Sequence, residues 1–400
     1  MSEWLQCIGC DSRFDAMEIR YTCDCGNLLS VERDALPAST ADFDARRASR
    51  DPIDQSGVWR FREGIMDTAD IVTHPEGATR LYERGGIFFK HEGENPTGSF
   101  KDRGMTVAIT QARRVGARAV ACASTGNTSS SLAAYAAQAG LRAIVFMPAG
   151  KVSAGKIAQT LGYGATALQV RGDFDAAMRL VREACDRLGI YLVNSINPFR
   201  IEGQKTIVWE LLQDLEWNAP DWIVVPAGNL GNTSAFGKAL GEAHRAGWIS
   251  RMPRLASIQA SGANPFFRSF SESFAQRHRV AAETVASAIR IGDPVSYEKA
   301  VASIRLTNGV VEEVTDAELL AAKREIDEMG IGCEPASATT FAGVKKLRAS
   351  GVIRDGERIV CVLTGHILKD ADAIMANVPR ERVIEIDPTL AAVEAAVGIK

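Results

Sequence analysis

The sequence predicts an α/β protein made of two doubly wound lobes, each a mainly parallel sheet with helices on both faces. Two observations support this fold class. From residue 118 onward, short apolar runs alternate with longer segments of helical period, the pattern of repeated strand–turn–helix units. The chain of 400 residues is also longer than one hydrophobic core usually serves, so two lobes are expected.

The alternation forms two series of elements. The first series has predicted strands at residues 119–123, 142–147, 166–170 and 191–193. Helical periods lie between and after them, at residues 129–139, 153–161, 174–188 and 203–215. The second series follows residue 220, with strands at 222–226, 254–259 and 358–363 and helices that include 231–246 and 316–329. Each series can form one lobe, with its ligand crevice expected at the carboxyl ends of the strands.

These patterns divide the chain into five predicted segments. They are a cysteine module at 1–35, a connector leading into the core at 36–105, a smaller lobe at 106–217, a larger lobe at 218–375 and a tail at 376–400. The connector includes a loop that carries Lys101, and the larger lobe includes a glycine-bearing loop.

Composition limits the classes of partner. The formal net charge of −3 provides no basic field, which argues against nucleic acid. No apolar run approaches the roughly 20 residues that a membrane span needs, and the first residues lack the apolar core of a signal peptide. We therefore expect a soluble cytoplasmic protein without a membrane partner.

Four of the eight cysteines lie close together near the N-terminus. Cys7 and Cys10 form a C-x-x-C pair, and Cys23 and Cys25 form a C-x-C pair about a dozen residues later. Four thiolates at this spacing can hold a structural zinc ion in tetrahedral geometry, although the second pair is one residue shorter than the common knuckle. A disulfide or unligated thiols are the alternatives. The other four cysteines lie singly in apolar segments and are expected to be buried thiols.

One lysine stands where a strand gives way to a helix. Lys101 follows a short β-type run at 86–90 and two turn signals, Asn95-Pro96 and Thr97-Gly98. A lysine near a helix N-terminus, with Arg103 close by, lies in a positive potential that lowers its pKa and frees an amine nucleophile. The alternative is an ordinary solvated lysine in a polar loop.

Two similar tetrapeptides occur in the two series. Gly126-Asn127-Thr128-Ser129 and Gly231-Asn232-Thr233-Ser234 each follow an apolar strand and open an alanine-rich helix. The second belongs to the loop Gly228-Asn229-Leu230-Gly231-Asn232, whose N–H groups can converge on one phosphate at a helix N-terminus. The two lobes are thus expected to present matched loops toward a shared cleft. The alternative is that Asn and Thr serve as ordinary N-caps.

The string around Lys101 supports a more specific interpretation. Ser99-Phe100-Lys101-Asp102-Arg103-Gly104, preceded by Glu94-Asn95-Pro96-Thr97-Gly98, resembles the cofactor-lysine motif of fold type II pyridoxal-phosphate enzymes. Within that group the sequence is similar to the threonine synthases over roughly residues 75–372. The resemblance implies the two-lobed fold type II architecture, with pyridoxal 5′-phosphate as cofactor and Lys101 as its covalent attachment point and proton carrier.

The same resemblance implies roles for further residues. Asn127 would bind the phenolic oxygen of the cofactor, Thr364 its ring nitrogen, and the loop at 228–232 its phosphate. The residues that would bind the substrate's carboxylate and nearby anionic groups are Ser124, Thr125 and Thr128. Those that would bind the phosphate of O-phospho-L-homoserine are Lys156, Asn194 and Arg200, with Thr128 beside them.

The resemblance implies conversion of O-phospho-L-homoserine and water to L-threonine and phosphate, by a homodimer. The chain departs from the family pattern at Ala78, Arg80 and Ile367, where relatives carry Asn, Pro and Gly. Two alternatives remain open. One is a threonine or serine dehydratase, or a β-replacement enzyme similar to cysteate synthase. The other is a catalytically silent relative that uses the same fold for binding.

Overall fold

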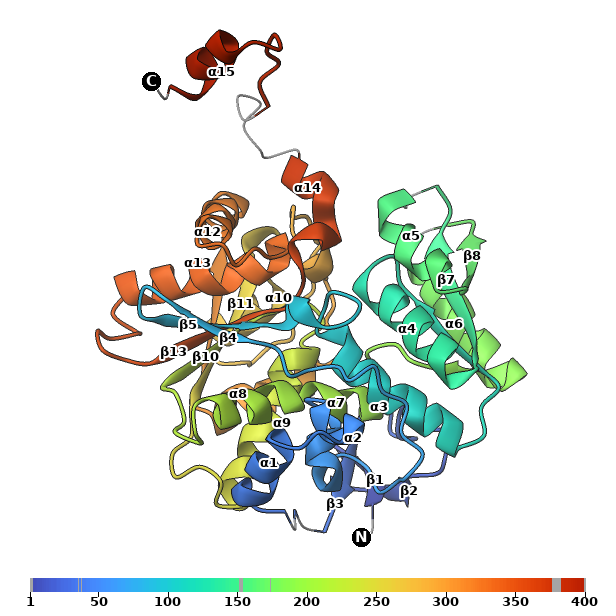
Figure 1. Cartoon of the computed structure of the whole chain (residues 1–400). Helices are drawn as coiled ribbons and strands as arrows, with labels where there is room; N and C mark the ends of the chain where they lie inside the picture. The colour runs from blue at the N-terminus through green and yellow to red at the C-terminus, as the bar shows by residue number, and fades with distance from the viewer. Residues whose placement is uncertain are drawn as a thin grey trace.

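The computed structural model describes residues 3–34, 36, 38–150, 154–172, 174–375 and 383–398. Two α/β lobes lie side by side, and a small N-terminal sheet lies below them (Figure 1). The strand orders in the three sheets are β2-β1-β3, β12-β11-β10-β13-β5-β4 and β8-β7-β6-β9. The second and third sheets belong to the two lobes, so the predicted α/β architecture is confirmed.

The smaller lobe has an all-parallel sheet. Its strands are β6 (Ala119–Ala123), β7 (Arg142–Pro148), β8 (Thr166–Val170) and β9 (Tyr191–Leu192). Its helices are α3 (Lys101–Arg114), α4 (Asn127–Ala139), α5 (Ala154–Gly162) and α6 (Phe174–Leu188). Two apolar clusters form its core, one containing Ile109 of α3 and Leu132 of α4, the other Val181 of α6. Because helices cover both faces, the strands read as short continuous apolar runs.

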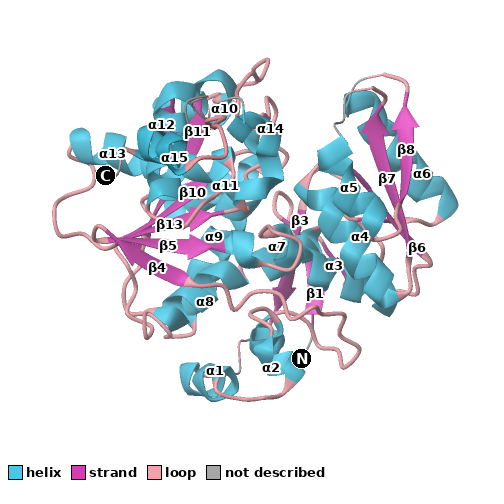
Figure 2. Cartoon of the chain, turned by 45° about the horizontal axis from the view of Figure 1, so that its top comes forward, coloured by secondary structure: helices cyan, strands magenta, loops and turns pink. Residues whose placement is uncertain are grey.

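The larger lobe has a six-stranded sheet in which only β4 is antiparallel. Its strands are β4 (Leu81–Arg84), β5 (Ile87–His91), β10 (Trp222–Pro226), β11 (Arg254–Ala260), β12 (Val310–Val314) and β13 (Ile359–Leu363). Figure 2 shows β4, β5, β10, β11 and β13 on one side of the molecule and β6 to β8 on the other. The connector that precedes Lys101 therefore supplies two strands of the larger sheet.

Helices surround the larger sheet. They are α7 (Pro198–Gln204), α8 (Thr206–Asp214), α9 (Gly231–Arg245), α10 (Pro265–Ser271), α11 (Tyr297–Leu306), α12 (Asp316–Glu328) and α13 (Pro335–Ala349). The sequence predicted one helix at 203–215, whereas α7 begins earlier because Asn197 caps it and Pro198 occupies its first turn. Both α7 and α8 contact α9, so this part of the predicted smaller lobe lies against the larger one.

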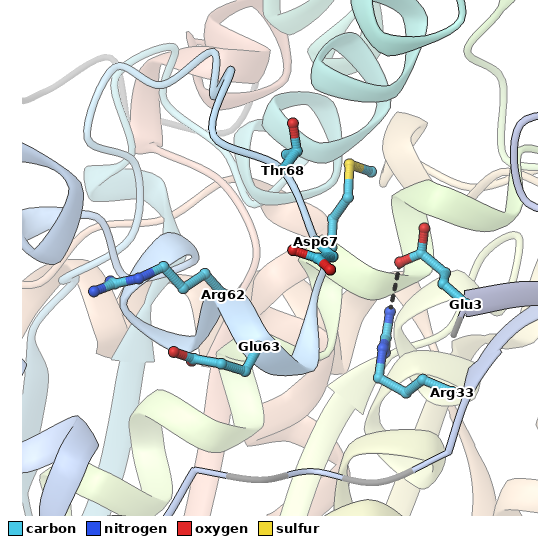
Figure 3. A pocket seen from close by; sticks show the side chains of 7 residues that line it. Glu3, Arg33, Arg62, Glu63, Asp67 and Thr68 are labelled. Carbon is cyan, nitrogen blue, oxygen red and sulfur yellow. Dashed lines mark hydrogen bonds and ion pairs between the residues drawn. The ribbon is translucent and has the colours of Figure 1, made fainter. Parts of the chain in front are cut away.

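The N-terminal module is an antiparallel sheet of β1 (Glu3–Cys7), β2 (Arg13–Asp15) and β3 (Leu29–Arg33). Two helices, α1 (Thr40–Arg47) and α2 (Pro52–Gln55), follow it. Arg33 joins the module to the core, since its Nη1 lies 2.7 Å from Glu202 Oε2 in α7. Arg33 Nη2 also lies 3.4 Å from Glu3 Oε2, and both side chains line a cavity of about 160 Å³ (Figure 3). A largely buried ion pair therefore fixes the module against α7.

The chain ends with α14 (Ala371–Met375) and α15 (Leu390–Val397). No residue of α15 is buried, and Figure 1 shows this helix apart from both lobes. None of the helices in the described part of the chain has the length and apolar character needed to cross a bilayer.

Candidate active site

Hydrogen bonds to a buried carboxylate fix the loop that carries Lys101. Asp102 accepts hydrogen bonds from the backbone N–H of Thr97 at 2.7 Å, from the Thr97 hydroxyl at 2.6 Å and from the Ser131 hydroxyl at 2.6 Å. Burial raises the pKa of Asp102 to about 6, and the three donors oppose this shift. Since Ser131 belongs to α4, these bonds hold the start of α3 against the first turns of α4.

A buried ion network lies behind the same loop. Arg103 is fully buried, with Nε 2.6 Å from Glu92 Oε2 and Nη2 2.8 Å from Glu210 Oε1. Glu210 also lies 2.7 Å from Lys90 Nζ. The sequence analysis attributed the positive potential at Lys101 to the helix N-terminus with Arg103 close by. The contribution of Arg103 is not found among the causes that shift the pKa of Lys101. The carboxylates of Glu92 and Glu210 neutralise the positive charge of the Arg103 guanidinium within this network.

The pKa of Lys101 is nevertheless lowered, to about 7. Burial is the main cause, the charge of Arg200 is the second, and Glu334 acts in the opposite direction. Lys101 Nζ lies 3.9 Å from the ring centroid of Phe100. A substantial fraction of the amine is therefore neutral at pH 7, which a nucleophilic lysine requires.

Glu334, which the sequence analysis did not identify, links two residues that it did. Asn127 Nδ2 donates to one carboxylate oxygen of Glu334 at 2.9 Å, and Thr364 Oγ1 donates to the other at 3.0 Å. Burial raises the pKa of Glu334, while the hydrogen bonds from Asn127 and Thr364 oppose this shift. The predicted partners of the phenolic oxygen and the ring nitrogen, one from each lobe, thus bind the same carboxylate. The Glu334-Pro335 helix start was the sequence signal that could have indicated this acid.

The loop between β6 and α4 presents small polar side chains. Ser124, Thr125 and Thr128 are partly exposed, and the Ser124 hydroxyl accepts a hydrogen bond from the backbone N–H of Gly126 at 3.3 Å. Within the described residues, no hydrogen bond is found for the hydroxyls of Thr125 and Thr128. No side chain caps α4, and its first turn contains no acidic residue. The loop can therefore donate hydrogen bonds to an anionic ligand.

The loop between β10 and α9 is more crowded and more buried. A Cβ atom added at Gly228 would lie 3.0 Å from Ile289 Cα, so only glycine fits there without a shift. Leu230 has φ +63°, which places it in the left-handed region. No side chain caps α9, and the buried Oδ1 of Asn232 has no hydrogen-bond partner among the described residues. Free helix N–H groups and a close-approach glycine fit a phosphate ligand, whereas the Asn232 oxygen, an acceptor, needs a different partner.

Arg200 is the candidate phosphate ligand that the structure describes best. Its side chain is 3 % exposed, Nη1 donates to Val193 O at 3.2 Å, and the buried Nε has no partner among the described residues. No ion pair of Arg200 with a carboxylate is found in the same part of the chain. Burial lowers its pKa to about 10, so the guanidinium remains charged at pH 7. A buried cation without a counter-charge is suited to an anionic ligand.

The other two predicted phosphate ligands differ from Arg200. Asn194 exchanges two hydrogen bonds with Ala123, from Nδ2 to the carbonyl oxygen at 3.0 Å and from the backbone N–H to Oδ1 at 2.9 Å. Its amide therefore fastens the end of β6. Lys156 belongs to α5, but its side chain lies outside the described residues.

The four N-terminal cysteines converge in the module. Their Sγ atoms all lie within 4.8 Å of one another, and Cys7–Cys25 and Cys10–Cys23 are separated by 3.4 and 3.5 Å. Cys7 and Cys23 are buried, while Cys10 and Cys25 are exposed. A side-chain hydrogen bond from Asn27 lowers the pKa of Cys25 to about 6. Four sulfurs at these separations fit the ligand set of one tetrahedral ion.

The fold and site define a class of enzyme. The sequence matches the family described as "Pyridoxal-phosphate dependent enzyme" over residues 70–365. This match spans the loop of Lys101, the loops at 124–129 and 228–232, and Thr364. The chain therefore belongs to the pyridoxal-phosphate-dependent enzymes of fold type II, and its closer similarities are to the threonine synthases.

Threonine synthases match the chain over nearly its whole length. One from Methanocaldococcus jannaschii is 44 % identical over 399 residues, which covers 96 % of each chain. Another, from Methanosarcina acetivorans, is 45 % identical over 383 residues and 93 % of each chain. The solved threonine synthase of Escherichia coli has a TM-score of 0.74 at 18 % identity, covering 99 % of this chain and 95 % of that one. At this identity the structural match shows a shared fold alone.

Proposed function

We propose that the protein converts O-phospho-L-homoserine and water to L-threonine and phosphate, with pyridoxal 5′-phosphate as cofactor. The observation that carries the proposal is that Lys101 and Arg200 lie close enough for the charge of one to affect the other. An amine whose pKa is lowered to about 7 lies within electrostatic range of a buried guanidinium that has no carboxylate partner among the described residues. A reaction on a phosphorylated amino acid needs both groups.

In this proposal the residues described above have separate roles in binding the cofactor and in moving protons. The loop at 228–232 would hold the cofactor phosphate, and Asn127 and Thr364 would contact the ring, which requires them to release Glu334. The cofactor supplies an electron sink for negative charge at the substrate Cα. The neutral amine of Lys101 removes the Cα proton and delivers protons in later steps. It would also take one proton from Cβ, so that a Cβ–Cγ double bond forms while the Cγ–O bond breaks and phosphate leaves with the bonding electrons. Water would then add its hydroxyl at Cβ, and protons would be returned to Cγ and Cα.

Steady-state turnover of O-phospho-L-homoserine, with phosphate and threonine both measured, tests this proposal. The Arg200→Gln variant should lose phosphate release by a factor of roughly 10²–10³, because a charge-assisted contact to a buried phosphate is removed. Deamination of L-threonine, which carries no phosphate, is the control reaction. A wild-type protein that deaminates threonine but leaves O-phospho-L-homoserine intact would be a dehydratase instead.

We also propose that Cys7, Cys10, Cys23 and Cys25 bind one structural zinc ion. The common separation of their sulfurs supports this assignment. Metal analysis of the purified protein should find about one zinc per chain. Replacing buried Cys23 with Ser should remove the metal and lower the melting temperature, whereas Cys185→Ser, in another buried cysteine, should retain the metal.

The resemblance to the threonine synthases further supports a homodimer in the cytoplasm. Light scattering on a size-exclusion column would give a mass of two chains for the dimer. A mass of one chain at micromolar concentration would contradict this assembly.

A further inference from the structure

Lys369 extends from the larger lobe to the smaller one beside the loop of Lys101. It lies in the short helix η5 (Ile367–Asp370), directly after the segment that contains Thr364. Its Nζ donates to Gln159 Oε1 in α5 at 2.6 Å and to Ser130 Oγ in α4 at 3.1 Å. A Cβ atom added at Gly98 would lie 2.9 Å from Lys369 Cε, so the lysine stem runs across the lysine loop.

The charge of Lys369 is not compensated by its direct partners. Ser130 and Gln159 are neutral, and no carboxylate lies within ion-pair distance of Lys369 among the residues described. Asp102 and Glu334 act on it only from longer range, and they oppose the lowering of its pKa by burial without reversing it. Other cations of the interior differ, since Lys90 contacts Glu210 and Asp214, both at 2.7 Å. Folded proteins pair their poorly solvated charges unless a ligand does so. The ammonium of Lys369 is therefore available for an anion.

The surroundings of Lys369 also favour an anion. Ser130 lies in the first turn of α4 and donates to the carbonyl oxygen of Asn127 at 3.2 Å. That turn contains no acidic residue and has no side-chain cap, so a positive helix end lies beside the lysine. Gln159 follows the predicted phosphate ligand Lys156 by three residues in α5, close to one helical turn.

We infer that Lys369 is a further specificity-determining residue, which binds the phosphate of the substrate from the larger lobe. This inference rests on the proposed function and adds Lys369 to the ligands proposed for the substrate phosphate. In the absence of phosphate, Gln159 and Ser130 hold the ammonium at the edge of the cleft. When phosphate binds, the ammonium exchanges the neutral amide oxygen of Gln159 for an anionic oxygen, which forms a stronger hydrogen bond.

The test uses the holoenzyme and two probes, inorganic phosphate and L-threonine. For the Lys369→Met variant we expect the affinity for inorganic phosphate, measured by calorimetry, to fall about 10-fold or more. The affinity for L-threonine, which lacks phosphate, should change less than about threefold. The KM for O-phospho-L-homoserine should rise while the cofactor absorbance stays unchanged. Lys369→Arg should recover most of the phosphate affinity, because it keeps the charge.

A matched control is Lys345→Met, since Lys345 pairs with Glu325 on the surface and should leave every quantity unchanged. Unchanged phosphate affinity in Lys369→Met would overturn the inference. Equal losses for phosphate and L-threonine would also overturn it, because the lysine would then act on the carboxylate or on lobe closure. A wild-type protein that neither binds phosphate nor turns over O-phospho-L-homoserine would instead contradict the proposed function.

Discussion

The two matched tetrapeptides at the cleft share a sequence but differ in environment. In the smaller lobe, Asn127 and Thr128 are partly exposed, and the Asn127 amide reaches across to Glu334. In the larger lobe, Thr233 is fully buried and bonds to Ser257 at 2.8 Å, while Asn232 is 5 % exposed. The serines are equivalent, since Ser129 and Ser234 each donate to a backbone carbonyl of the preceding turn at 2.8 Å. The loop before α4 therefore presents side chains to a ligand, whereas the loop before α9 presents mainly backbone groups.

The difference arises from what surrounds each helix start. The loop before α9 leaves β10, a central strand of the six-stranded sheet, and lies under residues near Ile289. The loop before α4 leaves a strand of the smaller sheet and faces the cleft toward Glu334. Side chains can select a substrate only where they are exposed to it, so selection is expected in the smaller lobe and cofactor anchoring in the larger one.

The largest expected effect is on cofactor affinity and comes from a substitution at Gly228, in the loop assigned to cofactor anchoring. The Gly228→Val variant should weaken cofactor binding by about 10- to 100-fold, because the added side chain meets Ile289 and displaces the backbone N–H groups. Titration of the apoprotein with pyridoxal phosphate, followed by absorbance, measures this affinity. Gly247→Ala is the control, since a Cβ added at Gly247 meets no neighbour, although its φ of +73° already makes the substitution there strained. An equal loss in both variants would contradict the backbone role.

In the buried tetrapeptide of the larger lobe, Thr233→Val should lower the stability of the protein. The substitution leaves the buried Ser257 hydroxyl without its partner, which costs about 1–3 kcal/mol of unfolding free energy. Denaturant unfolding measures this loss. The KM for O-phospho-L-homoserine should stay within about twofold of the wild type, because the Thr233 side chain is fully buried and its hydroxyl bonds to Ser257.

The equivalent substitution in the smaller lobe, Thr128→Val, should have the opposite profile. The side chain is partly exposed, so unfolding free energy should change by less than about 0.5 kcal/mol. The KM for O-phospho-L-homoserine should rise about 5- to 10-fold, because one neutral hydrogen bond to the substrate is lost. If Thr128→Val destabilised the protein as much as Thr233→Val, the two loops would not differ in role.

The sequence predicted the elements that carry a clear hydrophobic period. The strands β6, β8 and β10 and the helix α6 begin and end at the predicted residues. It did not predict the burial difference between the two tetrapeptides, because identical residues carry no information about what covers them. Similarly, Arg103 was expected to act on Lys101, but its charge is consumed by Glu92 and Glu210, which lie 11 and 107 residues from it. Long-range charge pairing of this kind is invisible in local sequence.

Glu334 and Lys369 illustrate the same limit within the site. Each lies far along the chain from its partners, since Glu334 meets Asn127 and Lys369 meets Ser130 and Gln159 only after the lobes assemble. Local patterns marked Lys101 and the loops at 124–129 and 228–232 as candidates because strand–turn–helix junctions can be recognised from adjacent residues, and the family resemblance selected them. Residues that complete a site across a cleft need the tertiary fold.

The smallest expected effect concerns the pH at which the cofactor attaches. Attachment requires the neutral amine of Lys101, whose pKa is lowered to about 7 by burial and then by Arg200. The rate of attachment to the apoprotein should therefore increase as the pH rises through about 7 and level off above it. Arg200→Gln removes the positive charge that contributes to the lowered pKa of Lys101. The midpoint of the attachment rate against pH should therefore move to higher pH, by up to on the order of one unit. Arg251→Gln, which removes a surface charge paired with Asp221, should leave the midpoint unchanged. An unchanged midpoint in Arg200→Gln would mean that burial alone sets this pKa, and the charge of Arg200 would then have no part in activating the lysine.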